Sequence, residues 1–123
     1  MPIKKILIVD DSPTERYFLG ELLTRHGYTV SAAESAEEAV LKIKAAPPDL
    51  ILMDVVMPGQ NGFQFTRTLS RDPETQAIPV IICTSKNQQT DRIWGMRQGA
   101  RDYLVKPIKA EELLEKIAAL GAA

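Results

Sequence analysis

The sequence predicts an α/β fold of five consecutive strand–helix units, (βα)5, with a parallel sheet and helices on both of its faces. Five short apolar runs recur along the chain, and each is followed by a segment whose apolar residues have helical spacing. All eight prolines fall at the proposed boundaries, where a fixed φ angle and a missing N–H are tolerated. Because 123 residues suit one domain, we expect residues 1–123 to form a single unit.

The first unit begins with the strand Ile3–Val9, an apolar, β-branched run of the kind that is buried on both faces of a sheet. Ser12, with Pro13 after it and Glu15 three residues on, predicts a helix that starts with a capping box. Gly27 ends this helix. We expect its inner face to consist of Phe18, Leu19, Leu22 and Leu23.

The second and third units repeat the pattern. The strand Tyr28–Ala33 precedes a second capping box, Ser35 to Glu38, and Pro47 and Pro48 stop the helix that follows. The strand Leu50–Met53 precedes a helix over Gly62–Ser70. In the second helix, the residues expected to face inward are Ala36, Val40 and Ile43.

The fourth and fifth units complete the sheet. The strand Val80–Thr84 leads to a short helix, Thr90–Gln98, which Gly99 ends, and the strand Tyr103–Val105 leads to a helix over Glu111–Leu120. Residues expected to form the core-facing stripe of the fourth helix are Ile93, Met96 and Ala100. Trp94 lies one step off that stripe and is equally suited to half-buried packing and to contact with a partner.

Composition excludes several classes of function. Fifteen basic and sixteen acidic residues give a net charge of −1, and the basic residues form no run, so we expect no nucleic-acid partner. The N-terminal apolar run is too short for a signal peptide, and no segment approaches the 18 or so apolar residues of a membrane span. The single cysteine, Cys83, cannot form an intrachain disulfide. We therefore expect a cytoplasmic protein with no membrane contact.

Polar residues suited to chemistry lie at the carboxyl ends of four of the five predicted strands. Asp10 and Asp11 follow the first strand, Asp54 the third and Lys106 the fifth, while Thr84 closes the fourth. Ligands of open parallel sheets bind beyond the carboxyl ends of the strands. These side chains should therefore converge at one edge of the sheet.

Three carboxylates at one edge need positive charge nearby. At a separation of about 5 Å and an effective dielectric constant near 20, two of them repel each other by about 3 kcal/mol. Lys106 supplies one positive charge, and a divalent cation would supply the rest. All-oxygen ligands favour Mg²⁺, or Mn²⁺ or Ca²⁺, over zinc. Carboxylates, a hard cation, a lysine and a hydroxyl suit phosphoryl transfer, in which a carboxylate can be the nucleophile.

Each of these motifs alone has an ordinary structural interpretation. The Asp10–Asp11 pair could be a helix cap, Asp54 could open a turn, and Lys106 could be a solvated lysine before a loop. Together, however, such turns would have to place complementary groups at the same edge of one sheet by coincidence. We therefore favour a functional site.

The motifs IVDD, MDVVMPGQNG, PVIICTS and GARDYLVKP resemble those of response-regulator receiver domains, the family of the chemotaxis regulator CheY, over Ile3 to Leu120. The resemblance implies a flavodoxin-like, doubly wound sheet with strand order 2-1-3-4-5. It also implies that a histidine kinase, similar to CheA, transfers a phosphoryl group to Asp54.

The resemblance further assigns roles to individual residues. Mg²⁺ would be held by Asp10, Asp11, Asp54 and the backbone carbonyl of Val56. Lys106 would contact the phosphoryl group, Thr84 would donate a hydrogen bond to it, and Tyr103 would turn inward when Thr84 moves. The switch would change the surface formed by the fourth helix, the fifth strand and the fifth helix, where a target protein would dock.

Within this family, DDSPTE, MPGQNGF and the region around Trp94 most closely resemble the stand-alone regulators of twitching motility, the PilH and PilG type. A chain of this length implies a receiver domain without an output domain. Such a protein would be no enzyme apart from catalysing its own phosphorylation and dephosphorylation, and its output would pass through protein contacts.

Four other functions stay open. A phosphatase of the haloacid dehalogenase type also uses an aspartate nucleophile and Mg²⁺, but it needs Asp-x-Asp after the first strand, where this chain has Asp10, Asp11 and Ser12. A flavodoxin-like cofactor carrier would need a phosphate-binding loop that DDSPTE does not provide. The chain could also drain phosphate from a sister regulator, or be a docking module that is never phosphorylated.

Overall fold

The computed structural model describes residues 2–122 and contains five strands and five helices that alternate along the chain. The strands are β1 (Lys5–Val9), β2 (Thr29–Ala33), β3 (Leu50–Met53), β4 (Val80–Thr84) and β5 (Asp102–Val105). The helices are α1 (Pro13–Arg25), α2 (Ala36–Ala45), α3 (Gly62–Arg71), α4 (Gln89–Arg97) and α5 (Ala110–Ala122). All five predicted units are thus present, and most of their boundaries lie within two residues of those expected.

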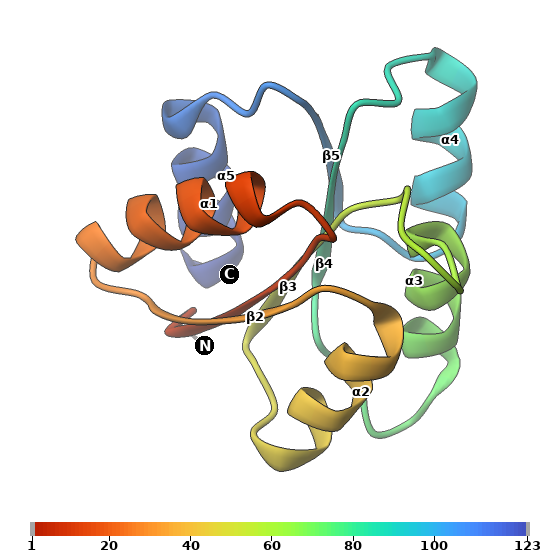
Figure 1. Cartoon of the computed structure of the whole chain (residues 1–123), viewed down its shortest axis with the longest axis horizontal. Coiled ribbons are helices and arrows are strands. Elements are labelled where there is room, and N and C mark those ends of the chain that lie inside the picture. Colours follow the sequence, from red (N-terminus) through yellow and green to blue (C-terminus); the bar gives the residue numbers. More distant parts are fainter. Residues whose placement is uncertain (1, 123) are drawn as a thin grey trace.

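The sheet is parallel throughout, with strand order β2-β1-β3-β4-β5, which confirms the predicted (βα)5 topology. Helices α1 and α5 cover one face, and α2, α3 and α4 cover the other (Figure 1). Every residue of β3 and β4 is buried, as expected for continuous apolar strands between two helical layers.

Two hydrophobic clusters hold the layers together, one on each face of the sheet. On the α1 and α5 side, Ile8 and Leu52 pack with Leu19, Leu113 and Ile117. On the opposite side, Leu7, Ile51 and Ile82 pack with Phe65 and Tyr103. Since alternate residues of one strand enter different clusters, each central strand is fixed from both sides.

The predicted inner faces of two helices need correction. In α4, Ile93 and Met96 are 46% and 41% exposed, and Gly95 is the buried residue. A Cβ atom at Gly95 would lie 2.9 Å from Ile82 and 3.1 Å from Tyr103. The missing side chain lets the α4 backbone approach the sheet, which turns the apolar neighbours of Gly95 outward.

In α1, Leu19 and Leu23 are buried as predicted, whereas Phe18 is 42% exposed. The expectation for Phe18 was therefore wrong. Trp94, at 48% exposed, lies outside the core as its position suggested. Among residues 2–122, no helix has the length and apolar character needed to cross a bilayer.

Candidate functional site

Strand register places the predicted site residues at one edge of the sheet. Val9 pairs with Ala33 on one side and with Met53 on the other, so Asp10 and Asp54 leave neighbouring strands at the same level. The N–H of Asp54 donates to the carbonyl of Val9 at 2.9 Å. Between the strands β4 and β5, the N–H of Lys106 donates to the carbonyl of Thr84 at 2.8 Å. The ladder thus extends one residue beyond the strands and fixes the backbone of the site.

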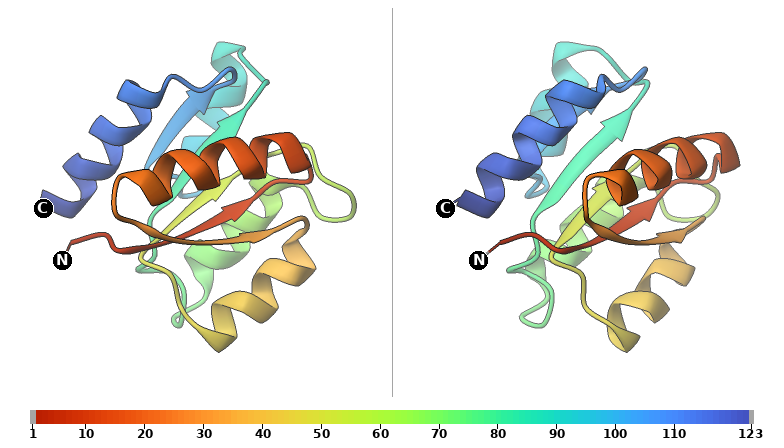
Figure 2. Two further views of the ribbon diagram at one scale, coloured as in Figure 1. Left: turned by 60° about the vertical axis from the view of Figure 1, so that its left-hand side comes forward. Right: turned by 90° about the vertical axis from the view of Figure 1, so that its left-hand side faces the viewer.

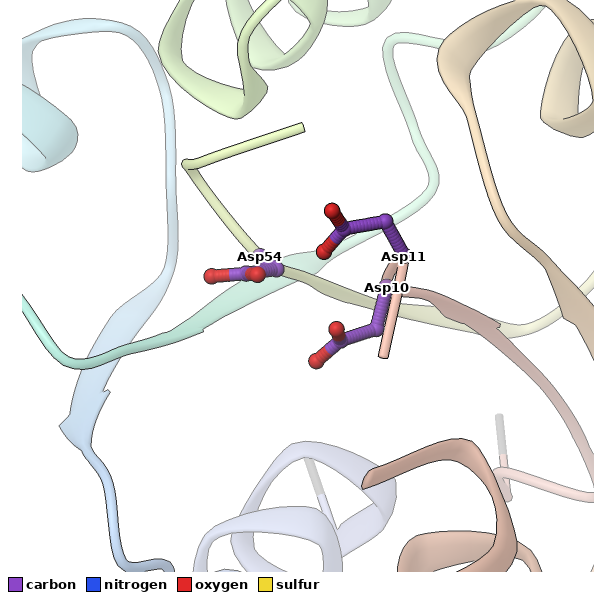
Figure 3. Close-up of side chains that lie close together, drawn as sticks. All are labelled: Asp10, Asp11 and Asp54. Atoms are coloured by element: carbon purple, nitrogen blue, oxygen red, sulfur yellow. The ribbon is translucent and has the colours of Figure 1, made fainter. Parts of the chain in front are cut away.

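The three carboxylates lie together, as the sequence predicted. One oxygen from each of Asp10, Asp11 and Asp54 lies within 4.8 Å of the other two, and Figure 3 shows the three side chains around a common space. Asp10 and Asp54 are 2% and 6% exposed, whereas Asp11 is exposed to solvent. The cluster is therefore anchored in the sheet and open on the side of Asp11.

Lys106 supplies the positive charge on the buried side of this cluster. Its Nζ atom lies 2.8 Å from Asp10 Oδ2 and 3.5 Å from Asp54 Oδ2. Burial lowers the pKa of Lys106, but the hydrogen bond to Asp10 and the charges of Asp54, Asp10 and Glu15 outweigh it and raise the pKa above the ordinary value. Lys106 therefore stays an ammonium group at neutral pH.

Backbone N–H groups bind the two buried carboxylates. Asp10 Oδ1 accepts a hydrogen bond from the N–H of Ser12 at 2.9 Å, and Asp54 Oδ1 accepts one from the N–H of Val55 at 2.8 Å. Arg16 donates through Nη1 to the carbonyl oxygen of Asp10 at 2.7 Å. This role of Arg16 was not predictable, because nothing in the helical pattern of α1 indicates that its side chain turns back to the loop after β1.

The environment of Asp54 favours its protonated form. Burial is the largest cause that raises the pKa of Asp54, and repulsion from Asp10 raises it further. The charge of Lys106, the N–H of Val55 and the hydroxyl of Thr84 act in the opposite direction without cancelling the effect. At Asp54 the repulsion from Asp10 thus exceeds the attraction of the Lys106 ammonium.

This raised pKa predicts a pH-dependent stability in the metal-free protein. Folded Asp54 retains its proton to a higher pH than unfolded Asp54. The Asp54 carboxyl therefore contributes most to the free energy of unfolding below its unfolded pKa of about 4. This contribution is lost as the pH rises through the folded pKa. Relative to wild type, Asp54→Asn should therefore gain stability as the pH rises from about 4 through the folded pKa of Asp54. Urea unfolding in EDTA measures the difference, and a difference that stays constant with pH would contradict it.

Thr84 and Tyr103 lie behind the carboxylates. Thr84 is fully buried at the end of β4, and its hydroxyl oxygen accepts a weak hydrogen bond from the N–H of Lys86 at 3.4 Å. Tyr103 is 2% exposed, and its hydroxyl donates to the carbonyl of Lys86 at 2.8 Å. The Arg92 guanidinium lies 5.9 Å from the centre of the Tyr103 ring. Burial, the main cause, raises the pKa of Tyr103 to about 12. Tyr103 is thus held in an inward position in this structure.

Gly62, the first residue of α3, supports the site. A Cβ atom on Gly62 would lie 1.9 Å from the carbonyl oxygen of Asp54, closer than any real contact. The N–H of Gly62 donates to the carbonyl of Val55 at 2.9 Å. The start of α3, which Asn61 caps, therefore packs directly on the backbone that carries Asp54. Val56 lies in the same loop with its side chain 58% exposed.

The residues present fit a magnesium ion. All candidate ligands are carboxylate or carbonyl oxygens, which Mg²⁺ prefers. Asp11 leaves the cluster open to solvent, which suits a cation that retains several waters and accepts a phosphate oxygen. The excess negative charge around Asp54 gives such a cation a favourable electrostatic environment.

Comparison with a family of known proteins agrees with this arrangement. Residues 6–118 match the model of the response regulator receiver domain. Protein PilH of Pseudomonas aeruginosa is 57% identical over 118 residues, which cover 96% of this chain and 98% of that protein. The phosphate regulon transcriptional regulatory protein PhoB of Escherichia coli is 36% identical, and the match covers 95% of this chain but 51% of PhoB.

Solved structures have the same fold over nearly the whole chain. A response regulator from Chloroflexus aurantiacus superposes with a TM-score of 0.92 at 33% identity, covering 100% of both chains. The chemotaxis protein CheY4 of Vibrio cholerae superposes with a TM-score of 0.88 at 32% identity, covering 95% of this chain and 98% of that one. The flavodoxin-like topology inferred from the motifs is therefore confirmed.

Proposed function

We propose, given that the chain belongs to the response-regulator receiver family, that it is a two-component signalling switch in which Asp54 accepts a phosphoryl group from a histidine kinase. The observation that carries this proposal is the convergence of three carboxylate oxygens within 4.8 Å, with the Lys106 ammonium between the two buried ones. Such a site combines a nucleophile with the positive charge that phosphoryl transfer requires.

In the proposed transfer, a carboxylate oxygen of Asp54 attacks the phosphorus of the phosphohistidine. A P–O bond forms, the P–N bond breaks, and the released imidazole nitrogen takes up a proton, so that Asp54 becomes an acyl phosphate. The Val55 N–H holds Asp54 Oδ1 at 2.8 Å and orients the carboxylate for this attack. Bound at Asp10, Asp11, Asp54 and the Val56 carbonyl, Mg²⁺ would neutralise charge between the carboxylates and the phosphoryl oxygens.

Phosphorylation would then redistribute the contacts of the site. The phosphoryl group brings about −1.5 to −2 charges, so the Lys106 ammonium would turn from Asp54 toward it. The Thr84 hydroxyl would donate a hydrogen bond to a phosphoryl oxygen, and Tyr103 would move further inward into the space that Thr84 leaves. Phosphorylation would shift the population from the first conformation of Thr84 and Tyr103 to the second. The size of this shift depends on how differently the two conformations bind the phosphoryl group.

The signal would leave through the surface formed by α4, β5 and α5. The exposed apolar residues of α4 and β5 are Ile93, Trp94, Met96 and Val105. Since Tyr103 belongs to β5 and packs against Gly95 of α4, a change in its position would alter this surface. We propose that a target protein docks there.

The pathway we propose is control of type IV pili and twitching motility, in the cytoplasm, with a CheA-like kinase as phosphodonor. This assignment rests on the 57% identity to PilH. The chain would catalyse only its own phosphorylation and dephosphorylation. Its phosphoryl group would be used either to recruit a target or to drain phosphate from a sister regulator.

The first test is phosphorylation of the purified wild type. With MgCl₂ and a small-molecule acyl phosphate, we expect the intact mass to increase by one phosphoryl group. Without MgCl₂ and in EDTA, we expect the unmodified mass, because the carboxylate charge then repels the anionic donor. Intact mass spectrometry measures both, and a wild type that stays unmodified in MgCl₂ would refute the mechanism.

A further inference from the structure

The carboxylate of Glu15, in the first turn of α1, has a buried oxygen without a partner. Its Oε2 atom is inaccessible to solvent and accepts no hydrogen bond, and no other side-chain oxygen or nitrogen among the described residues is left in this state. Burying an acceptor without a donor costs free energy, especially on a carboxylate. The position of this oxygen therefore needs an explanation.

The usual partner of such a glutamate is already engaged. In a capping box, the third helical residue would accept a hydrogen bond from the N–H of the cap residue, here Ser12. Ser12 does cap α1, because its hydroxyl accepts from the N–H of Glu15 at 3.3 Å. Its own N–H, however, donates to Asp10 Oδ1 at 2.9 Å. The predicted capping box is thus only half formed. Asp10, a residue of the site, accepts from the N–H group that would otherwise donate to the carboxylate of Glu15.

Lys106 is a hydrogen-bond donor whose ammonium charge interacts electrostatically with Glu15. The charge of Glu15 is among those that raise the pKa of Lys106, and it also raises that of Cys83, the residue before Thr84. The start of α1 and the loop between β5 and α5 lie at the same end of the sheet (Figure 2). Glu15 lies in the first turn of α1 at this end of the sheet, and its charge acts on Lys106, whereas Asp10 and Asp54 follow strands.

In the structure, Lys106 occupies oxygens that a cation would need. Its ammonium is bound to Asp10 Oδ2 at 2.8 Å and lies 3.5 Å from Asp54 Oδ2. Two positive charges at the same carboxylate oxygens repel each other, so a bound cation favours movement of the ammonium away from these oxygens. An ammonium that is mostly buried is costly without a counter-charge, so it needs another carboxylate within reach.

We infer that Glu15 is a positioning residue that receives the Lys106 ammonium when Asp10 turns to a bound cation. The unpartnered Oε2 of Glu15 then gains its missing donor, and Lys106 stays charged beside Asp54, ready to contact a phosphoryl group. This inference rests on the proposed function, because it assumes that Asp10 and Asp54 bind Mg²⁺.

The test is a double-mutant cycle on magnesium affinity, measured by calorimetric titration of the phosphate-free protein with MgCl₂. Glu15→Gln keeps the size of the side chain and removes its charge, so we expect Mg²⁺ to bind about threefold to tenfold more weakly than in wild type. In the Lys106→Ala background, the same Glu15→Gln change should alter the affinity by less than about twofold, because no ammonium has to be relocated.

The controls separate positioning from simple attraction of a cation. Glu21→Gln removes the same charge from an exposed position on α1 and should leave the affinity unchanged. Urea unfolding should show that Glu15→Gln is at least as stable as wild type, since a buried unpartnered charge is lost. Glu15→Asp, which retains the charge on a shorter side chain, should recover part of the affinity.

Two results would overturn the inference and leave the proposed function standing. One is an unchanged affinity in Glu15→Gln, and the other is an equal loss with and without Lys106, which would make Glu15 a source of general attraction only. A wild type that takes up no Mg²⁺ would instead overturn both the inference and the magnesium site on which it rests.

Discussion

Replacing Asp54 by asparagine is expected to abolish incorporation of the phosphoryl group. The amide that replaces the carboxylate is a poor nucleophile and cannot form the acyl phosphate, while its size preserves the packing of a residue that is 6% exposed. With MgCl₂ and a small-molecule acyl phosphate, intact mass spectrometry should therefore detect one added phosphoryl group in wild type and none in Asp54→Asn.

A matched control comes from the other end of the same strand. Asp49 precedes β3, and its Oδ2 accepts hydrogen bonds from the N–H groups of Lys4 and Lys5 at 2.9 Å, far from the site edge. Asp49→Asn should be phosphorylated like wild type. If Asp54→Asn gained a phosphoryl group, another residue would be the acceptor. If the variant still hydrolysed a generic aryl phosphate and lost this activity only with Asp10→Asn, the phosphatase alternative would be favoured.

The edge of the sheet was predictable because it depends on backbone periodicity alone. Continuous apolar runs specify parallel strands, and the residues after parallel strands share one edge. That Asp10 and Asp54 leave neighbouring strands followed only from the strand order that the resemblance to receiver domains implies, and the register confirms it. The same argument placed Thr84 and Lys106 at that edge, and the N–H of Lys106 extends the β4–β5 ladder there.

The faces of the helices were harder to predict because a glycine decides one of them. In α4, apolar periodicity favoured Ile93 and Met96 as core residues, yet the close approach of Gly95 to Ile82 and Tyr103 turned them outward. Sequence patterns count apolar side chains, whereas this contact depends on the absence of one. Gly62 is a second example, because the absence of its side chain leaves space for the Asp54 carbonyl.

The sequence also could not predict that Asp10 and Glu15 compete for a single backbone donor, the N–H of Ser12. The segment from Ser12 to Glu15 fits a capping box, but it does not reveal that Asp10 takes the N–H of Ser12. A local pattern assumes that its partners are free, and in this protein the functional site uses one of them. The consequence, an unpartnered oxygen on Glu15, becomes visible only in three dimensions.

Gly62→Ala is expected to be the most destabilising small substitution in this part of the chain. The added Cβ would lie 1.9 Å from the Asp54 carbonyl oxygen, 2.8 Å from the Asp54 carbonyl carbon and 2.9 Å from Val55 Cα. All three contacts are with backbone in the buried edge of the sheet, which cannot rotate away as a flexible side chain would. We expect a loss of about 3 kcal/mol in the free energy of unfolding, measured with urea.

Gly20→Ala provides the matched control, because it makes the same chemical change within a helix. A Cβ at Gly20 would meet nothing within 4 Å, so alanine should stabilise α1 by about 0.5 to 1 kcal/mol through its higher helix propensity. Opposite signs for the two variants would identify the contact with Asp54, and not the loss of a glycine as such, as the cause. A Gly62→Ala variant as stable as wild type would contradict the packing described for this loop.

Gly62→Ala also connects stability to function, provided that it is assayed at a temperature where the variant remains folded. To accommodate the Cβ, the start of α3 or the segment Asp54–Val55 has to move, and the N–H of Val55 that orients Asp54 Oδ1 at 2.8 Å moves with it. Because misplacing a reacting group by about 1 Å can lower a rate by two orders of magnitude, phosphorylation by the small-molecule donor should slow at least tenfold. Gly20→Ala should react at the wild-type rate. A folded Gly62→Ala variant with an unchanged phosphorylation rate would show that α3 does not position the nucleophile.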